Sequence, residues 1–524
     1  MGCIASPLAK SLPAAGATGR VSFAQALPVA LLLGAAMSVS LAPIHAWWFA
    51  PPCLAALFYL LGSQTPLRSA ACGFAFGLGW FGIGLWWVVQ GLMETSEAGV
   101  ALSAALGALL IGYLSLFPAA AGMVIGPLSR IDSPWLRAAA LASAWTLCDW
   151  LRGSLMGGMP MLASGSAHST GPLAGYAPLA GVHGLGLLNA LAAALLAQWL
   201  RPRALWPVRA ARLAAVQAVA LAALLLAGQL LRGHPWTADS GTLSVRIVQA
   251  DQRPAERSGA RSVVLANLLY ARLVEGGRAD LTVLPETALP IQWDAMPPVA
   301  RAQWQQLANR NGAIVLGAMA SAPAQAALIG DSSNSAFGLL PGADQAYRYD
   351  KVKLVPLAER MPQSMAWLAR LLSVQFGGLL PGTGTQAPLR LAQPDARVAL
   401  AICYENQFGH YMAQQASQGQ VLAVLNSLAW GHGTYAAAQY TQASQLRALE
   451  TGRWVLQASN GGPSALIDPD GTIVDALPEQ ATGVLAGRAG LRDGATPYMH
   501  AGDTPLLLAM LAALLTSAWK RLCN

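Results

Sequence analysis

Charged side chains are scarce in this sequence of 524 residues, where Asp, Glu, Lys and Arg together make up 11%. Soluble domains carry about 25% charged residues, so much of this chain does not face water. Hydrophobic residues make up 55% of the chain, and its mean hydropathy is +0.44. This composition excludes an ordinary soluble globular protein and predicts a protein embedded in a membrane.

Cysteine is also scarce, with six residues in the whole chain. Cys53, Cys72 and Cys148 lie in apolar stretches, where a thiol usually behaves as a small buried hydrophobe. Cys403 is the only cysteine within the charged part of the chain, so no internal disulfide can form there. A single thiol in that setting is a candidate reactive group.

Several motifs that would indicate other chemistry are missing. The sequence has no His-Glu-x-x-His motif and no Cys-x-x-Cys pair, so we expect no metal site and no cofactor. It has no Gly-x-Ser-x-Gly elbow, which argues against a serine hydrolase. The net charge of +8 comes without a compact basic patch interleaved with aromatics, so we expect no nucleic-acid partner.

Long uncharged runs, in contrast, are abundant, and a membrane span needs about 20 apolar residues. The segment from Val21 to Leu61 is long enough for two helices, divided at Ala42-Pro43-Ile44-His45 because proline ends or kinks a helix. Seven helices are predicted before residue 232 and an eighth near the C-terminus. The remaining predicted spans are Ser69–Met93, Ala98–Ser129, Ala138–Leu151, Ala177–Leu200, Leu213–Leu231 and Thr504–Trp519.

The charges of the loops indicate an orientation, because Lys and Arg are retained on the cytoplasmic side. If the helices alternate in direction, the basic loop residues all fall on one face, whereas the loop after the third helix carries Glu94 and Glu97. Both termini are therefore predicted to be cytoplasmic. The basic residues are Lys10, Arg20, Arg68, Arg130, Arg137, Arg201, Arg203, Arg209, Arg212, Lys520 and Arg521.

Residues 232–503 have a different character, because charges return and short β-type runs alternate with helical stretches. This alternation predicts an α/β sandwich. The chain is thus divided into a membrane bundle at 1–231, an extracytoplasmic domain at 232–503, and a last span with a cytoplasmic tail at 504–524. The predicted strands are Leu243–Ala250, Leu281–Leu284, Ala313–Met319, Ser335–Leu340, Val398–Ile402, Val421–Leu425 and Val455–Ala458.

Three segments of this domain carry reactive side chains. Strand-like runs lead into Glu286 and Cys403, and Lys351 lies in the segment Tyr349–Glu359. Singly, these residues have simpler interpretations: a helix-capping acid, an inert buried thiol and a solvated lysine. Together, a carboxylate, an amine and a thiol are the groups needed to activate a thiol and stabilise an oxyanion.

These residues resemble the Glu-Lys-Cys triad of the nitrilase, or carbon-nitrogen hydrolase, superfamily, which implies an αββα sandwich. With about eight membrane helices, the chain resembles the apolipoprotein N-acyltransferase family over nearly its whole length. The further segments that carry the resemblance are Asp149-Trp150-Leu151-Arg152-Gly153, Gly171-Pro172-Leu173-Ala174-Gly175, Arg447-Ala448-Leu449-Glu450-Thr451-Gly452-Arg453, Ser459-Asn460-Gly461-Gly462 and Thr496-Pro497-Tyr498.

The resemblance implies a two-step reaction in the bacterial cytoplasmic (inner) membrane, with the catalytic domain on the periplasmic side. Cys403 would take an acyl chain from a phospholipid as a thioester. The acyl chain would then pass to the α-amine of the lipidated N-terminal cysteine of a diacylated lipoprotein. Glu286 would act as general base, and Lys351 would stabilise the oxyanion.

The resemblance also assigns supporting residues. Glu359 would hold Lys351 or assist the base, and Tyr404 and Glu405 match positions that flank the nucleophile. Candidate pocket residues are Asn426, Trp430 and Phe376. The apolar stretch Trp367–Leu380 is interpreted either as a lid near the membrane or as an ordinary core helix and loop.

One loop departs from the family pattern. Asn426–Gly433 lacks the acid of the usual Asn-Asp-Ala-Trp-Phe-Gly segment and is one residue longer. Two alternatives therefore stay open: a nitrilase-type paralogue, similar to conjugal-transfer proteins, that acts on another amine or amide, and a non-catalytic membrane scaffold. Asp149 and Arg152 are expected to form a structural ion pair, because they lie three residues apart on one helix.

Overall fold

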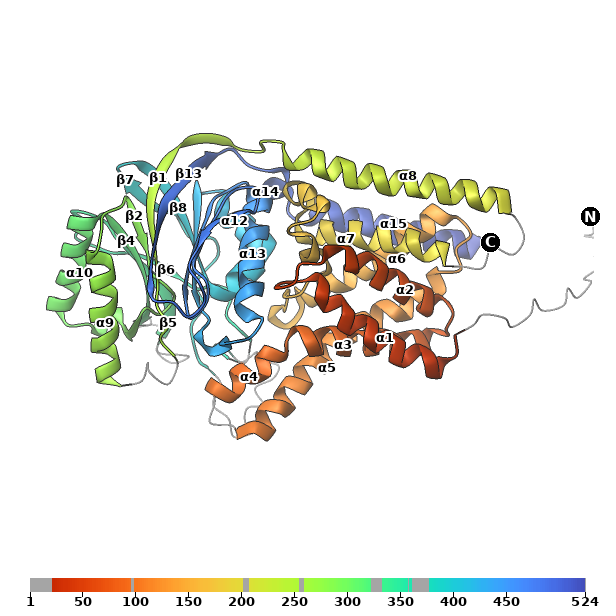
Figure 1. Ribbon diagram of the computed structural model, residues 1–524, viewed down its shortest axis with the longest axis horizontal. Coiled ribbons are helices and arrows are strands. Elements are labelled where there is room, and N and C mark those ends of the chain that lie inside the picture. Colours follow the sequence, from red (N-terminus) through yellow and green to blue (C-terminus); the bar gives the residue numbers. More distant parts are fainter. Residues whose placement is uncertain are drawn as a thin grey trace, which may run out of the picture.

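The computed structural model describes residues 21–95, 99–200, 207–253, 259–321, 332–356, 358–360 and 377–523. It consists of a helical bundle and an α/β sandwich arranged end to end along the longest axis (Figure 1). The bundle contains α1 (Phe23–Met37), α2 (Ala50–Gly62), α3 (Pro66–Gly84), α4 (Trp86–Thr95), α5 (Gly99–Leu128), α6 (Pro134–Arg152), α7 (Ala177–Trp199), α8 (Pro207–Arg232) and α15 (Thr504–Cys523).

Each of the eight segments predicted to span the membrane contains a helix of this bundle. Within the described ranges, four helices are long and apolar enough to cross a bilayer, and α3 with α4, bent by 51°, could form a fifth span. The chain is therefore a multi-pass membrane protein, whereas a count of eight spans stays a prediction. The expected pair in α6 is confirmed, with Arg152 Nη2 lying 2.7 Å from Asp149 Oδ1.

Helix α3 packs closely against both α1 and α5, and glycines at the crossings allow this contact. A Cβ atom on Gly34 or Gly79 would lie within about 2 Å of a backbone carbonyl oxygen across the α1–α3 crossing, and one on Gly73 would meet Pro118 of α5 at 2.2 Å. Small residues at such crossings let helices associate in a membrane, where apolar side chains gain little by leaving lipid.

The sandwich consists of two sheets with helices on both outer faces. One sheet has the order β13-β1-β2-β4-β5-β6, with β3 paired to β4, and the other has the order β12-β11-β10-β9-β8-β7. Helices α9 (Ala260–Glu275) and α10 (Pro298–Asn311) cover the first sheet. Helices α12 (Gly409–Ala416) and α13 (Ala436–Thr451) lie between the second sheet and the bundle (Figure 1). The predicted αββα arrangement is confirmed.

All seven predicted strands are present, as β1, β2, β4, β5, β8, β9 and β10. The parallel pairs β1–β2, β2–β4, β8–β9 and β9–β10 bring the carboxyl ends of these strands to common edges. The strands are β1 (Ala238–Gln249), β2 (Leu281–Val283), β3 (Leu289–Gln292), β4 (Ala313–Ser321), β5 (Ser332–Leu339), β6 (Tyr347–Asp350), β7 (Leu389–Ala392), β8 (Asp395–Ile402), β9 (Val421–Ser427), β10 (Val455–Asn460), β11 (Ala465–Ile467), β12 (Ile473–Ala476) and β13 (Gly483–Asp493).

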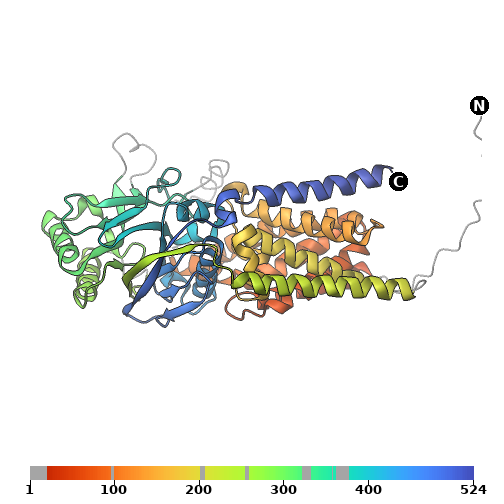
Figure 2. The ribbon, with the colours of Figure 1, turned by 90° about the horizontal axis from the view of Figure 1, so that it is seen from above.

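The chain enters and leaves the sandwich through neighbouring strands. Strand β1 follows α8, strand β13 leads through α14 (Pro497–Ala501) to α15, and the two strands pair antiparallel along most of their length. Figure 2 shows α8 and α15 running along the outside of the bundle, away from the sandwich. Because both connections lie on the same side of the sandwich, the sandwich is held at one end of the bundle.

Candidate active site

The three reactive side chains predicted from the sequence each follow the end of a strand. Glu286 lies three residues after β2, Lys351 directly follows β6, and Cys403 directly follows β8. All three are buried, with relative exposures of 6%, 1% and 5%. The structure therefore brings them into the protein interior at one edge of the two sheets.

The backbone at Cys403 is strained. Its φ angle of 52° lies in the left-handed region, which residues other than glycine rarely adopt. The adjoining 3-10 turn, Cys403–Gln407, changes the direction of the chain immediately after β8. Strain of this kind persists only where the surroundings hold it in place, and it is enriched at functional sites.

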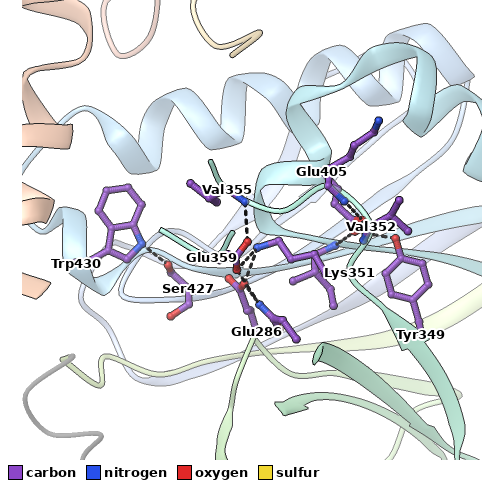
Figure 3. Close-up of polar contacts among 12 residues, drawn as sticks. Glu286, Tyr349, Lys351, Val352, Val355, Glu359, Glu405, Ser427 and Trp430 are labelled. Carbon is purple, nitrogen blue, oxygen red and sulfur yellow. Dashed lines mark hydrogen bonds and ion pairs between the residues drawn. The ribbon is translucent and has the colours of Figure 1, made fainter. Parts of the chain in front are cut away.

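Lys351 lies between two carboxylates (Figure 3). Its Nζ is 3.2 Å from Glu286 Oε1 and 2.8 Å from Glu359 Oε1. Asn334, at the start of β5, donates from Nδ2 to the same two oxygens at 2.7 and 3.3 Å. The second oxygen of Glu359 accepts from the Val355 amide at 2.8 Å, so both acids are fixed in place. No sequence motif pointed to Asn334.

These charges act on one another and on the thiol. Burial disfavours the ammonium of Lys351, but Glu286 and Glu359 outweigh this and hold its pKa well above the usual range. Burial and the charges of Glu286 and Glu359 raise the pKa of Cys403, while Lys351 lowers it. These shifts favour the ammonium form of Lys351 and the protonated thiol of Cys403.

Glu405 holds the backbone that carries Cys403. One of its oxygens accepts from the amide of Ile402 at 2.7 Å and from the Tyr349 hydroxyl at 2.7 Å. The other accepts from the amides of Val352 and Lys353 at 2.6 and 3.2 Å (Figure 3). This fully buried carboxylate thus joins the Cys403 turn to the segment after Lys351. Burial raises the pKa of Glu405, and the hydrogen bonds that it accepts oppose that shift.

Tyr404 connects the Cys403 turn to the bundle. Its hydroxyl donates to the Gly158 carbonyl at 2.7 Å, in the loop after α6. Trp430 also reaches the bundle, because its ring centroid lies 5.1 Å from that of Trp87 in α4 and its Nε1 donates to the Ser427 carbonyl at 2.6 Å. The site is therefore built against the membrane helices.

The other predicted pocket residues have different outcomes. Asn426 is fully buried at the end of β9, with Nδ2 3.5 Å from Ser459 Oγ. Phe376 lies outside the described residues, as does the predicted lid Trp367–Leu380 apart from its last four positions. In the loop that departs from the family pattern, His432 Nε2 pairs with Asp251 Oδ1 at 2.9 Å. The segment that follows β1 therefore brings the carboxylate of Asp251 to a loop that contains no acidic residue.

Regions that match known proteins cover most of the chain. Residues 33–195 match the apolipoprotein N-acyltransferase N-terminal domain, and residues 244–491 match the carbon-nitrogen hydrolase family. The apolipoprotein N-acyltransferase of Ralstonia nicotianae is 35% identical over 95% of this chain and 94% of its own length. That of Chromobacterium violaceum is 35% identical over 94% of each.

Solved structures resemble the sandwich only distantly. The crystal structure of the C. elegans NitFhit protein matches 52% of this chain and 65% of its own, with 18% identity and a TM-score of 0.37. That likeness is too remote to bear on activity. The full-length relatives are decisive, since they align with the bundle and the sandwich together. The chain belongs to the apolipoprotein N-acyltransferase family.

Proposed function

We propose that this protein transfers an acyl chain from a phospholipid, by way of a thioester on Cys403, to the α-amine of the N-terminal lipidated cysteine of a diacylated lipoprotein. The observation that carries this proposal is the buried cluster of Glu286, Lys351 and Glu359, whose charges reach the Cys403 thiol. It supplies a base, a fixed cation and a nucleophile in a single buried site.

In the first step, Glu286 removes the proton from the Cys403 thiol, and the thiolate attacks the carbonyl carbon of a phospholipid ester. A carbon–sulfur bond forms, and the negative charge on the carbonyl oxygen is stabilised by Lys351. The ester carbon–oxygen bond then breaks. The departing alkoxide takes the proton from Glu286 and leaves as a lysophospholipid, while the acyl chain remains on sulfur.

In the second step, the α-amine of the lipoprotein attacks the thioester carbonyl and gives up a proton to Glu286. The carbon–sulfur bond breaks, an amide is formed, and the Cys403 thiolate recovers a proton from Glu286. Because the pKa of Cys403 is raised, the resting thiol holds its proton. The base is therefore needed to start each cycle, and Glu359 keeps Lys351 oriented throughout.

Both substrates carry acyl chains, and the site adjoins the bundle through Tyr404 and Trp430. We propose that lipid reaches Cys403 from the bilayer on the sandwich side of the bundle. The C-terminus, with Lys520 and Arg521, lies at the opposite end (Figure 1). Basic ends are retained in the cytoplasm, so this geometry supports cytoplasmic termini and a periplasmic sandwich in the bacterial inner membrane.

A second candidate is a paralogue that uses the same nucleophile on another amine or amide. The loop Asn426–Gly433 favours it, because this loop lacks the acid of the usual family segment and is one residue longer. Transfer assays separate the two candidates. If the acyl chain loads onto Cys403 but never passes to a diacylated lipopeptide, the paralogue is supported and lipoprotein acylation is excluded.

The proposal is tested by incubating membranes that contain the protein with a phospholipid bearing a labelled acyl chain. We expect hydroxylamine-sensitive label on the protein, and none on the Cys403→Ala variant. Labelling that persists in Cys403→Ala would contradict the assignment of Cys403 as nucleophile. If the native protein takes no label from any phospholipid, the scaffold and amide-cleaving interpretations remain.

The roles of the charged groups are tested with matched lysine variants. We expect Lys351→Ala to lower thioester formation by about 10²–10³-fold, the usual effect of removing an oxyanion donor, and Glu286→Ala to abolish it. Lys353→Ala is the control, since Lys353 contacts Glu405 only through its backbone amide. Equal losses in Lys351→Ala and Lys353→Ala would refute the specific role of Lys351.

A further inference from the structure

The α6 loop, residues 156–162, contacts the hydroxyl of Tyr404. The Gly158 carbonyl accepts a hydrogen bond from this hydroxyl at 2.7 Å, and Met159 Sδ lies 3.2 Å from the same oxygen. Tyr404 directly follows Cys403 in the chain, and it is 1% exposed. The loop is therefore a part of the membrane bundle that holds the turn carrying the nucleophile.

The backbone of the α6 loop is strained. Met156 and Leu162 have φ angles of 55° and 56°, in the left-handed region that residues other than glycine rarely adopt. Gly158 has a φ angle of 74°, and a Cβ atom there would lie 2.1 Å from the Gly153 carbonyl oxygen and 3.1 Å from the Phe408 ring. A backbone of this kind keeps its shape only where neighbouring groups fix it.

Arg152 and Asp149, near the end of α6, supply such contacts. The Arg152 guanidinium donates from Nη1 to the carbonyls of Met159 and Met161, the second at 2.7 Å. Its Nε and Nη2 donate to Asp149 Oδ1 at 3.2 and 2.7 Å. The other oxygen of Asp149 accepts from the amide and the hydroxyl of Ser164 at 2.8 and 2.9 Å. The exposures of Arg152 and Asp149 are 1% and 7%, so little water competes for these bonds.

We propose that Arg152 is a positioning residue for acyl transfer which, paired with Asp149, fixes the α6 loop. The Gly158 carbonyl then holds Tyr404, and Tyr404 holds the turn that carries Cys403. This inference rests on the proposed role of Cys403 as nucleophile. Arg152 is too deeply buried to touch a substrate, so it acts through the loop. Its planar guanidinium serves a carboxylate and two carbonyls at once, which the point charge of a lysine cannot do.

The test compares Arg152→Lys with the native protein in single-turnover thioester formation at increasing phospholipid concentration. The variant keeps a positive charge beside Asp149 but loses the fork that also reaches the loop. We expect the maximal rate to fall by about tenfold, because a hydrogen bond that fixes a reacting group is worth roughly this factor. The phospholipid concentration that gives half the maximal rate should stay unchanged, since Arg152 does not contact the substrate.

A double-variant cycle identifies the route. Tyr404→Phe removes the hydroxyl that binds Gly158, and we expect a similar loss of about tenfold. If Arg152 acts through this hydrogen bond, Arg152→Lys combined with Tyr404→Phe should be no slower than Tyr404→Phe alone, because coupled positions are not additive. Losses that multiply to about a hundredfold would overturn the inference, because they would show that the two residues act independently.

Arg137→Lys is the matched control. Arg137 is a partly buried arginine at the other end of α6, where its guanidinium donates to the Ile131 carbonyl at 2.7 Å and to Gln198 Oε1 at 2.9 Å. The maximal rate of this variant should equal that of the native protein. Equal losses in Arg137→Lys and Arg152→Lys would contradict the inference. Thermal unfolding in detergent shows whether each variant is folded.

A native maximal rate in folded Arg152→Lys would overturn this inference and leave the proposed function intact. If Arg152→Lys does not fold, Asp149→Asn takes its place in the cycle with the same expected outcomes, because it weakens the same pair while keeping its shape. Label that persists in Cys403→Ala would instead contradict the assignment of Cys403 as nucleophile, on which both proposals rest.

Discussion

Helices α9 and α13 have the same length, 16 residues, and each covers the outer face of a sheet. Helix α9 buries only Ala266, Tyr270, Ala271 and Val274, and leaves Val264, Leu265 and Leu268 more than half exposed. Every residue of α13 except Ala438 is buried, although many of them are polar. Helix α9 is an outer layer of the sandwich that faces solvent, whereas α13 lies inside the molecule.

The polar side chains of α13 bind backbone groups where helices of the bundle break. Gln439 binds the carbonyl at the end of α3, Gln442 binds the Ala42 amide at 3.2 Å, and Glu450 binds the Val182 amide at 2.8 Å, beside a kink in α7. Broken helix ends leave backbone groups without partners. The sandwich satisfies them, so α13 joins the turn Cys403–Gln407 to the membrane helices.

The largest effect on stability is expected from Arg447→Ala in α13. Arg447 Nη2 lies 2.9 Å from Glu450 Oε1, and both side chains are almost fully buried. Leaving a buried charge unpaired typically costs about 3–5 kcal/mol. Denaturant unfolding in detergent measures the change, and Arg447→Met combined with Glu450→Gln should recover most of the loss. A change below about 1 kcal/mol would show that α13 does not depend on this pair.

The Arg447–Glu450 pair also makes the stability of the folded protein depend on pH. Burial raises the pKa of Glu450 to about 7, although Arg447 and the Val182 amide oppose this shift. The folded state therefore binds a proton that the unfolded chain releases near its ordinary pKa of about 4.3. The stability that this group contributes is present below that value and is lost as the pH rises through about 7. The cost of Arg447→Ala should accordingly be smaller at pH 5 than at pH 8.

A smaller effect is expected from Gln442→Ala. Its amide donates to the Ser166 carbonyl at 3.0 Å and to Ser169 Oγ at 3.2 Å, and its oxygen accepts from Ala42. Removing it leaves buried backbone groups without partners, at a cost of about 1–3 kcal/mol. Gln445→Ala is a control within the sandwich, because Gln445 binds the Gly471 carbonyl. If α13 joins the two parts, Gln442→Ala alone should increase proteolysis of the bundle loops near Ala42.

The smallest effect is expected on α9. Leu268 is 55% exposed, so Leu268→Ala should change the free energy of unfolding by no more than about 0.5 kcal/mol. Leu446 of α13 is 2% exposed, and Leu446→Ala should cost about 2–5 kcal/mol. Equal costs measured by thermal unfolding for the two variants would remove the distinction between the helices.

The sequence predicted the central strands, and with them Glu286 and Cys403, for one reason, whereas Lys351 follows the short edge strand β6 and was singled out by the resemblance to a family motif. Strands buried on both faces, such as β9, are continuous apolar runs, and polar residues immediately after such strands stand out. Short strands such as β6, β7 and β12 lie at sheet edges and carry partly or fully exposed positions, so their composition resembles that of loops.

Other features depend on contacts between distant segments. Asn334 carries no motif, and its importance comes only from the Glu286 and Glu359 carboxylates to which it donates. The burial of nearly every residue of helix α13 could not be predicted, because polar residues normally indicate a solvent-facing helix. The bundle supplies the partners that make this burial possible, and a single-sequence pattern does not contain that information.

The central claim is tested most directly by mass spectrometry of the peptide that contains Cys403, after incubation of the native protein with phospholipid and then with a diacylated lipopeptide. We predict one acyl chain on Cys403 after the first addition, and its transfer to the lipopeptide α-amine after the second. Transfer to the lipopeptide while Cys403 stays unmodified at every time point, or acylation of a different residue, would contradict the account.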